Sequence, residues 1–151
     1  EGTVTWLPQS MPGLVIGGSY SLLDSEITKK LLPTNDVRVG DSLAFAPELQ
    51  FNANARYNWT MANGMDAHVM YNIAYSDESY SDIIRINRDR VNSWTMMGLT
   101  AGVETDTWKA TAYVENLTDE RAELSRNYVN DRERATYARP RTIGLRVSYK
   151  F

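Results

Sequence analysis

The chain has 151 residues, of which 42% are hydrophobic and 23% are charged, and its formal net charge is −3. This composition excludes a disordered tail, and the weakly acidic balance provides no basic field for nucleic acid, so no nucleic-acid partner is expected. The sequence contains no cysteine and one histidine, His68, which excludes disulfide scaffolds and cysteine nucleophiles and argues against a histidine metal site or a Ser/His/Asp triad.

Alternation of apolar and polar residues is the main signal along the chain, and it predicts strands, whose successive side chains point to opposite faces. Val4 and Trp6 indicate the end of a first strand, and a weaker alternation over 14–22 predicts a second. The clearest run covers 49–60, where one face would carry Leu49, Phe51, Ala53, Ala55, Tyr57 and Trp59. Further runs predict strands at 67–76, 97–104, 108–115 and 143–151. No run approaches the ~20 apolar residues of a membrane helix, but several match the ~9–11 residues with which a tilted strand crosses a bilayer.

The connections between the predicted strands alternate between short and long. The short ones are 7–13, 61–65 and 105–107, and the long polar ones are 25–45, 77–91 and 119–139. This asymmetry is typical of outer-membrane barrels, which have short periplasmic turns and long external loops. In such a barrel the outward face near the short turns carries interfacial aromatics, and the residues with that parity and position are Trp6, Tyr57, Trp59, Trp108, Tyr149 and Phe151.

The predicted fold class is therefore all-β, an antiparallel transmembrane β-barrel. Six complete strands and one stub do not suffice, because a closed membrane barrel needs about eight strands and an open edge in lipid leaves backbone groups unpaired. Bacterial barrels also have both ends of the chain in the periplasm, whereas residue 1 would lie inside the wall. We expect 1–151 to be the C-terminal portion of a larger barrel. A soluble antiparallel sandwich also alternates apolar and polar residues, but it explains neither the strand lengths nor the aromatic ends.

Several segments resemble TonB-dependent outer-membrane receptors. Residues 113–120, with the motif Asn116, Leu117, Thr118 and Asp119, resemble a segment in the next-to-last strand of these receptors. The ending 140–151 resembles their last strand, and 2–8, 17–21 and 46–48 are similar to strands further back, so the resemblance covers nearly the whole chain. It implies a plugged barrel of roughly 22 strands, of which this chain would be the C-terminal part, without the N-terminal plug and the TonB box.

The resemblance also implies a function, a location and partners. Such receptors lie in the bacterial outer membrane and bind a scarce nutrient, by default a ferric siderophore, with vitamin B12 or an oligosaccharide as alternatives. The implied partners are outer-membrane lipid, TonB acting through the missing N-terminal part, the barrel-assembly machinery and the small-molecule nutrient. A passive pore or structural barrel and a small soluble ligand-binding β-protein are the competing hypotheses. No enzyme activity, cofactor or metal is expected, because paired carboxylates in a pocket, a phosphate-binding glycine loop and a nucleophile elbow are all absent from the sequence.

The last residues match the pattern polar-x-Gly-x-x-apolar-x-apolar with a terminal aromatic. The matching residues are Thr142, Gly144, Val147, Tyr149 and Phe151. The resemblance implies that the assembly machinery recognises this ending, and an exposed strand can offer its backbone for pairing while alternate side chains give specificity. The alternative is a plain final strand with one outward face.

The long connections carry most of the remaining polar residues. In 119–141 the charged residues suggest either recognition of an anionic ligand or a solvated loop with many salt bridges; they include Arg121, Glu123, Arg126, Asp131, Arg132, Glu133, Arg134, Arg139 and Arg141. Asp77, Glu78 and Asp82 could suggest a cation site, but their spacing matches no calcium loop. We interpret 116–119 as structural, because Asx side chains cap backbone groups at strand ends. Arg56 and His68 would face the lumen.

Overall fold

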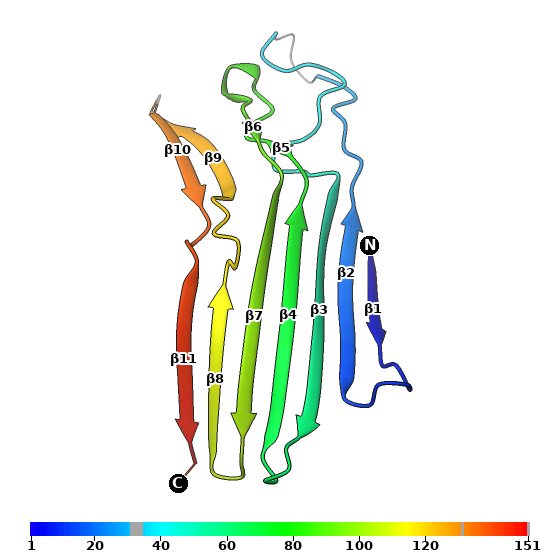
Figure 1. Ribbon diagram of the computed structural model, residues 1–151. Helices are drawn as coiled ribbons and strands as arrows, with labels where there is room; N and C mark the ends of the chain where they lie inside the picture. The colour runs from blue at the N-terminus through cyan, green and yellow to red at the C-terminus, as the bar shows by residue number, and fades with distance from the viewer. Residues whose placement is uncertain (31–34, 131, 151) are drawn as a thin grey trace.

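The computed structural model describes residues 1–30, 35–130 and 132–150, and its main feature is one antiparallel sheet (Figure 1). In spatial order its seven strands are β1 (Gly2–Trp6), β2 (Leu14–Leu22), β3 (Leu49–Thr60), β4 (Asp66–Ser76), β7 (Trp94–Glu104), β8 (Trp108–Glu115) and β11 (Thr142–Tyr149). We call this sheet the wall. The predicted all-β antiparallel fold is confirmed, and β2, β3 and β8 have the predicted bounds.

The register gives the wall two chemically different faces. On one face Ala55 lies between Ile16 of β2 and Tyr71 of β4. On the other face Asn54 lies between Gly17 and Asn72. Because a strand alternates its side chains with a period of two, every strand of the wall contributes to one apolar face and one polar face.

The wall is a single layer, and so it has almost no core of its own. The buried hydrophobic residues among the described ones are only Ala67, Val91 and Ala122. Large apolar side chains of β11 lie in the open, with Ile143 75% and Leu145 70% exposed. An apolar surface of this extent indicates contact with lipid or with another protein.

The short and long connections lie at opposite ends of the wall (Figure 1). The short-turn end contains the turns 7–13, 61–65 and 105–107. The other end contains the described parts of three longer segments, 23–48, 77–93 and 116–141, which we call the cap. No helix among the described residues is long and apolar enough to cross a membrane.

The cap contains short elements that the alternation of apolar residues did not predict. In the second segment β5 (Ser79–Tyr80) pairs with β6 (Arg90–Val91) on either side of the 3-10 turn η1 (Arg85–Asn87). In the third segment β9 (Glu123–Val129) and β10 (Arg132–Tyr137) form a hairpin. These strands lack an apolar face, because most of their residues are charged or polar, and so they carry no periodic signal.

Candidate functional site

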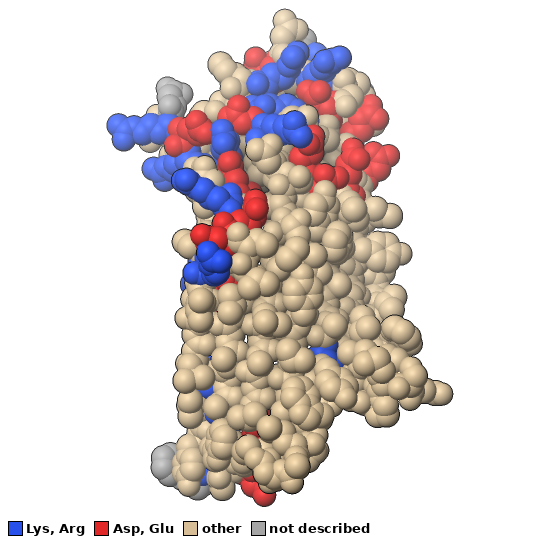
Figure 2. Space-filling model, in the orientation of Figure 1, with Lys and Arg blue, Asp and Glu red and all other residues tan. Residues whose placement is uncertain are grey.

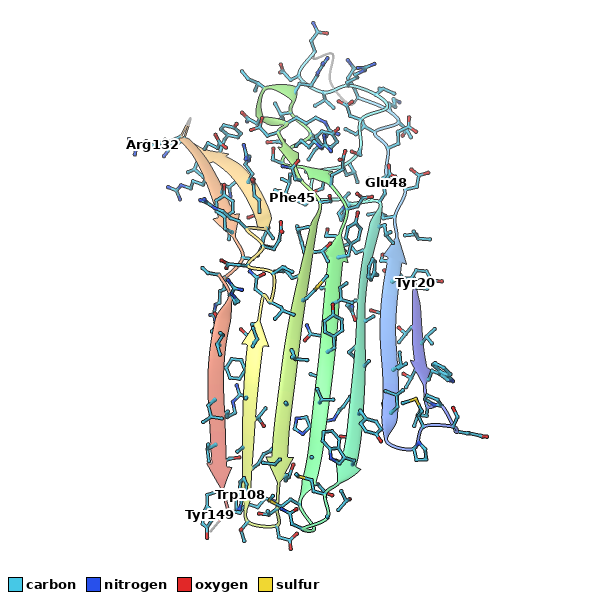
Figure 3. All side chains as sticks on the ribbon, viewed as in Figure 1. Tyr20, Phe45, Glu48, Trp108, Arg132 and Tyr149 are labelled. Atoms are coloured by element: carbon cyan, nitrogen blue, oxygen red, sulfur yellow. The ribbon has the colours of Figure 1, made fainter. Side chains whose placement is uncertain are left out.

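An aromatic belt lies on the apolar face at the short-turn end of the wall. Tyr57 and Trp59 stack with their ring centroids 5.5 Å apart, and Tyr149 lies opposite Trp108 in the ladder (Figure 3). Trp6 ends β1 on the same face and is 58% exposed. These are the positions that alternation assigned to interfacial aromatics, except for Phe151, which lies outside the described residues.

A second aromatic group lies on the same face near the cap, and sequence reasoning did not single it out. Phe51 and Tyr75 stack at 5.3 Å, and Tyr20 lies opposite Phe51 on the neighbouring strand. From Phe51 to Trp59 along β3 is about 27 Å, which corresponds to roughly 20 Å along a barrel axis at the usual strand tilt. The aromatic belt at the short-turn end and this second aromatic group near the cap therefore enclose an apolar band whose height is comparable to the ~25 Å band of membrane barrels.

Figure 2 shows the same division as a surface. The face in view is almost free of charged side chains along the wall, and lysine, arginine, aspartate and glutamate gather over the cap. Arg56, His68 and Lys109 belong to the wall but lie on its polar face. The wall therefore presents an uncharged surface on one side only.

The polar face is lined by hydrogen-bonded side chains near the short-turn end. Arg56 Nε donates to Asn58 Oδ1 at 2.8 Å, and Lys109 Nζ lies 3.0 Å from Glu104 Oε2. A hollow of about 290 Å³ is lined by residues of β3, β4 and β7, among them Arg56, His68 and Glu104. His68 is 6% exposed and lies across Gly102, where a side-chain Cβ would come within 2.5 Å of its Cε1 atom. Arg56 and His68 are thus on the face expected from the alternation.

Asn116 closes the base of the β9–β10 hairpin. It has a positive φ of 52° and is 7% exposed. Its Nδ2 donates to the carbonyl oxygens of Glu120 at 2.9 Å and Arg139 at 2.8 Å, while its Oδ1 accepts from the Glu120 amide at 2.8 Å. Asp119 Oδ1 accepts from the Arg141 amide at 2.8 Å. Two side chains of the 116–119 motif therefore join the two ends of the hairpin, whereas Leu117 and Thr118 are exposed.

Arg88 joins the first two segments of the cap. Its guanidinium donates to the Ser42 carbonyl oxygen, Ser42 Oγ and the Asp82 carbonyl oxygen, each at 2.9 Å. The same group lies 3.9 Å from the Tyr80 ring centroid and only 11% of the side chain is exposed. A backbone hydrogen bond from Phe45 to the Tyr80 carbonyl oxygen, 2.8 Å long, supports the same junction.

The next residue, Asp89, joins the second segment to the hairpin. Its carboxylate accepts a hydrogen bond from Tyr128 Oη and lies 3.7 Å from Arg126 Nη1. Arg126 also forms a bidentate pair with Glu123, at 2.6 and 2.8 Å, and an ion pair with Glu133 at 2.5 Å. Consecutive residues thus connect all three segments of the cap.

These contacts shift the titration of the cap residues. The hydrogen bond from Arg126 lowers the pKa of Glu123 below its ordinary value of 4.5, and the same bond raises the pKa of Arg126. The hydrogen bond to Asp89 raises the pKa of the Tyr128 phenol above its ordinary value of 10.0. This network gives the 119–141 segment internal salt bridges, in line with the interpretation of the segment as a solvated loop with many salt bridges. Asp131 lies outside the described residues.

The acidic residues of the second segment serve local contacts. Asp77 Oδ1 accepts from the Glu78 amide at 2.9 Å, and Asp82 Oδ1 accepts from the Ile84 amide at 2.9 Å. Glu78 pairs with Arg90. Within the described part of the chain no group of three or more histidine, cysteine, aspartate or glutamate side chains could hold a metal ion.

The last strand divides its pattern residues between the two faces. Thr142 and Gly144 lie on the polar face, opposite Glu115 and Tyr113, and the Tyr113 ring occupies the space beside Gly144. Val147 and Tyr149 lie on the apolar face and are 64% and 60% exposed. Within the described residues β11 pairs only with β8, so its other edge is free.

An antiparallel wall with a belted apolar face, a polar face, short turns at one end and long loops at the other defines the class of outer-membrane β-barrel proteins. The family model of the TonB dependent receptor-like β-barrel matches residues 1–117, and the chain belongs to this family. None of the curated proteins compared with the chain matches it. The family consists of receptors and transporters of the bacterial outer membrane, with TonB as partner and a small molecule as substrate, and it is not a family of enzymes.

Proposed function

We propose that the chain is the C-terminal part of the barrel of a TonB-dependent receptor that takes up a ferric siderophore. The observation that carries this proposal is the open wall with one apolar and one polar face. In lipid the free edges of β1 and β11 would leave backbone groups unpaired. Further strands that close the barrel satisfy these groups and enclose the polar face as a lumen.

The ligand is proposed to meet the cap first. Cap side chains are accessible, with Phe45 46% and Ile86 86% exposed, and Phe45 and Glu48 lie at the cap end of the wall (Figure 3). Phe45 also has a positive φ of 51°, a conformation that costs about 1–3 kcal/mol for a residue with a side chain and is common at functional sites. Aromatic and charged groups together suit a ferric chelate, which has both organic and charged surface.

Two measurements on the native receptor test the proposal. The intact mass of the protein extracted from outer membranes, identified by peptides of this sequence, should be roughly three to five times larger than the 17.1 kDa of this chain. Uptake of radioactive iron supplied as a ferric siderophore should require the receptor and should stop when TonB is removed.

Each alternative has its own result. Uptake that continues without TonB would support a passive pore instead. TonB-dependent uptake of another nutrient would change the ligand but keep the transporter. A native mass near that of this chain, or recovery without detergent, would contradict the receptor barrel.

We also propose that the ending of β11 is the signal for the barrel-assembly machinery, with Thr142, Gly144, Val147, Tyr149 and Phe151 as its residues. The outer edge of β11 supports this proposal, because an edge without a neighbouring strand in the described residues can add to another sheet. Tyr149→Ala should lower the amount of receptor assembled in the membrane. Tyr57→Ala, at the same belt but inside the wall, is the matched control, and an equal loss in both variants would reduce the role of Tyr149 to lipid contact.

A further inference from the structure

The short turn between β3 and β4 brings two methionines opposite each other. The Met61 amide donates to the Met65 carbonyl oxygen at 2.8 Å, which extends the pairing of Thr60 with Asp66 by one step. Residues that are paired directly in an antiparallel ladder have Cβ atoms about 4.5–5.5 Å apart and point to the same face. Gly64 has a φ of +83° and open space where a side chain would stand. We call Met61 and Met65 the methionine pair.

The methionine pair has the parity of the apolar face and follows Trp59. Met61 lies two residues after Trp59, and Met65 lies two residues before Ala67, the ladder partner of Trp59. Side chains two positions apart on one strand lie next to each other on the same face. Met61 is 37% exposed and Trp59 is 40% exposed, so a small ion can reach both a thioether and the indole ring from solvent.

Packing against lipid does not explain the pair. Trp59 belongs to the aromatic belt, and the turn lies beyond it, on the side away from the apolar band. The turn 105–107 occupies the same end of the wall with the polar sequence Thr-Asp-Thr, so this position does not require apolar side chains. The turn 7–13 contains Met11, whose backbone partners are Pro8 and Leu14. Facing methionines therefore distinguish the turn 61–65 from the other two short turns.

The oxygen donors of this hairpin are engaged elsewhere. Asn63 Oδ1 accepts a hydrogen bond from the Met65 amide at 3.2 Å, and Asp66 Oδ1 accepts one from Thr60 Oγ1 at 2.8 Å. Asp66 also has the parity of the polar face, opposite the face of the methionine pair. The donors that the turn presents on its apolar face are thus two uncharged thioether sulfurs, which are soft ligands.

We propose that the methionine pair binds Cu(I) through its two sulfur atoms, with the Trp59 ring beside the ion. Thioether ligands select soft cations such as Cu(I), and the flexible methionine side chain allows two sulfurs to converge on one ion. A tryptophan ring attracts a cation at its face. Short turns of an outer-membrane barrel face the periplasm, so the ion would come from that side. This site goes beyond the proposed function and does not depend on the nutrient.

Native mass spectrometry of the full-length receptor in detergent tests the site. The probe is silver nitrate in a chloride-free buffer, because Ag(I) has the charge and softness of Cu(I) without its redox chemistry. The wild type should hold one silver ion more than Met61→Leu or Met65→Leu, in which a side chain of similar volume preserves the hairpin. The matched control is Met11→Leu, which removes a methionine that is 51% exposed from another short turn and should bind like the wild type.

A second measurement examines the surroundings of the ion. Silver should quench the fluorescence of Trp59, and Trp59→Leu should remove this quenching and weaken silver binding roughly two- to fivefold, the contribution of a cation over an exposed ring. Thioethers carry no proton, so binding should be unchanged at about pH 5, where histidine is protonated. Cu(I) added without oxygen should displace the silver ion.

Other outcomes overturn the inference. Equal silver counts in the wild type and Met61→Leu would exclude the pair, and an equal loss in Met11→Leu would mean unspecific binding by exposed methionines. Loss of the ion at low pH would indicate a histidine ligand, and failure of Cu(I) to displace silver would exclude copper as the occupant. A receptor that binds silver at this turn but takes up no ferric siderophore would contradict the proposed function and leave this site intact.

Discussion

The wall and the cap of this molecule are held together by different kinds of contact. In the wall the strands are joined by ladders of backbone hydrogen bonds, and few side chains are buried. In the cap, side chains such as Arg88, Asn116 and Arg126 join segments that are distant in sequence. The wall depends on its surroundings to cover its two faces, whereas the cap carries its own contacts.

This difference indicates how substitutions should act. The effect of a substitution in the wall on the free energy of unfolding should depend on the backbone conformation at that position and on the face to which the side chain points. A change in the cap should matter according to the particular hydrogen bonds that it removes, and its effect should stay local. The following predictions test this division, and they begin with the largest expected effect.

The first prediction concerns two turn glycines of the wall. Gly13 has a φ of +93°, and a Cβ there would collide with the Asn58 carbonyl oxygen, while Gly64 has a φ of +83° and open space around it. Gly13→Ala should reduce the free energy of unfolding by about 2–5 kcal/mol, the sum of left-handed strain and overpacking, and Gly64→Ala by only about 1–2 kcal/mol. Urea unfolding of the receptor in lipid vesicles measures both. Equal losses would show that backbone contact at Gly13 is unimportant.

The second prediction separates the two faces of β3. Ala55 lies on the apolar face midway between Phe51 and Trp59, and Asn54 lies next to it on the polar face. Ala55→Arg should cost about 2–4 kcal/mol, because it places a charge in the middle of the lipid band. Asn54→Arg should cost less than about 1 kcal/mol. The same unfolding assay applies, and a costly Asn54→Arg with a tolerated Ala55→Arg would reverse the assignment of the faces.

The sequence was sufficient to predict the wall because its signal is local and periodic. Alternation located β3 and β8 to the residue, and it also placed Tyr57 and Trp108 on the apolar face. β7 begins three residues before its predicted start, at Trp94, because the ladder with β4 continues to Ser76. Here tertiary pairing extends the strand beyond the apolar pattern.

The contacts of the cap could not be predicted in this way. Arg88 binds Ser42, which is 46 positions away, and Asn116 binds the Arg139 carbonyl oxygen, 23 positions away. Neither pair leaves a periodic trace in the sequence, since a side-chain donor and a backbone acceptor impose no pattern on the residues between them. The charge density of 119–141 was visible, but the gathering of three carboxylates around Arg126 was not.

The third prediction tests whether the cap contacts act locally. Arg88→Ala removes three hydrogen bonds to Ser42 and Asp82 and should weaken the junction by about 2 kcal/mol, so that the Phe45 amide exchanges its hydrogen roughly 30-fold faster. Amides of β3 and β4 should keep their protection. In Arg85→Ala, the control, the backbone hydrogen bond from residue 85 to Asp36 remains available, and Phe45 should exchange as in the wild type. Faster amide exchange throughout the wall would contradict the expectation that the contacts of the cap act locally.

The smallest expected effect is the pH-dependent loss of the hydrogen bond from Tyr128 to Asp89. Because this hydrogen bond raises the pKa of Tyr128 above 10.0, its contribution to stability is fully present below pH 10.0 and is lost as the pH rises through the raised value. Subtracting the phenolate absorbance of Tyr128→Phe from that of the wild type isolates one of the nine tyrosines. The midpoint should lie above 10.0 and should fall toward 10.0 in Asp89→Asn, because the acceptor charge is then absent. A midpoint that does not respond to Asp89 would contradict the hydrogen bond from Tyr128 to Asp89.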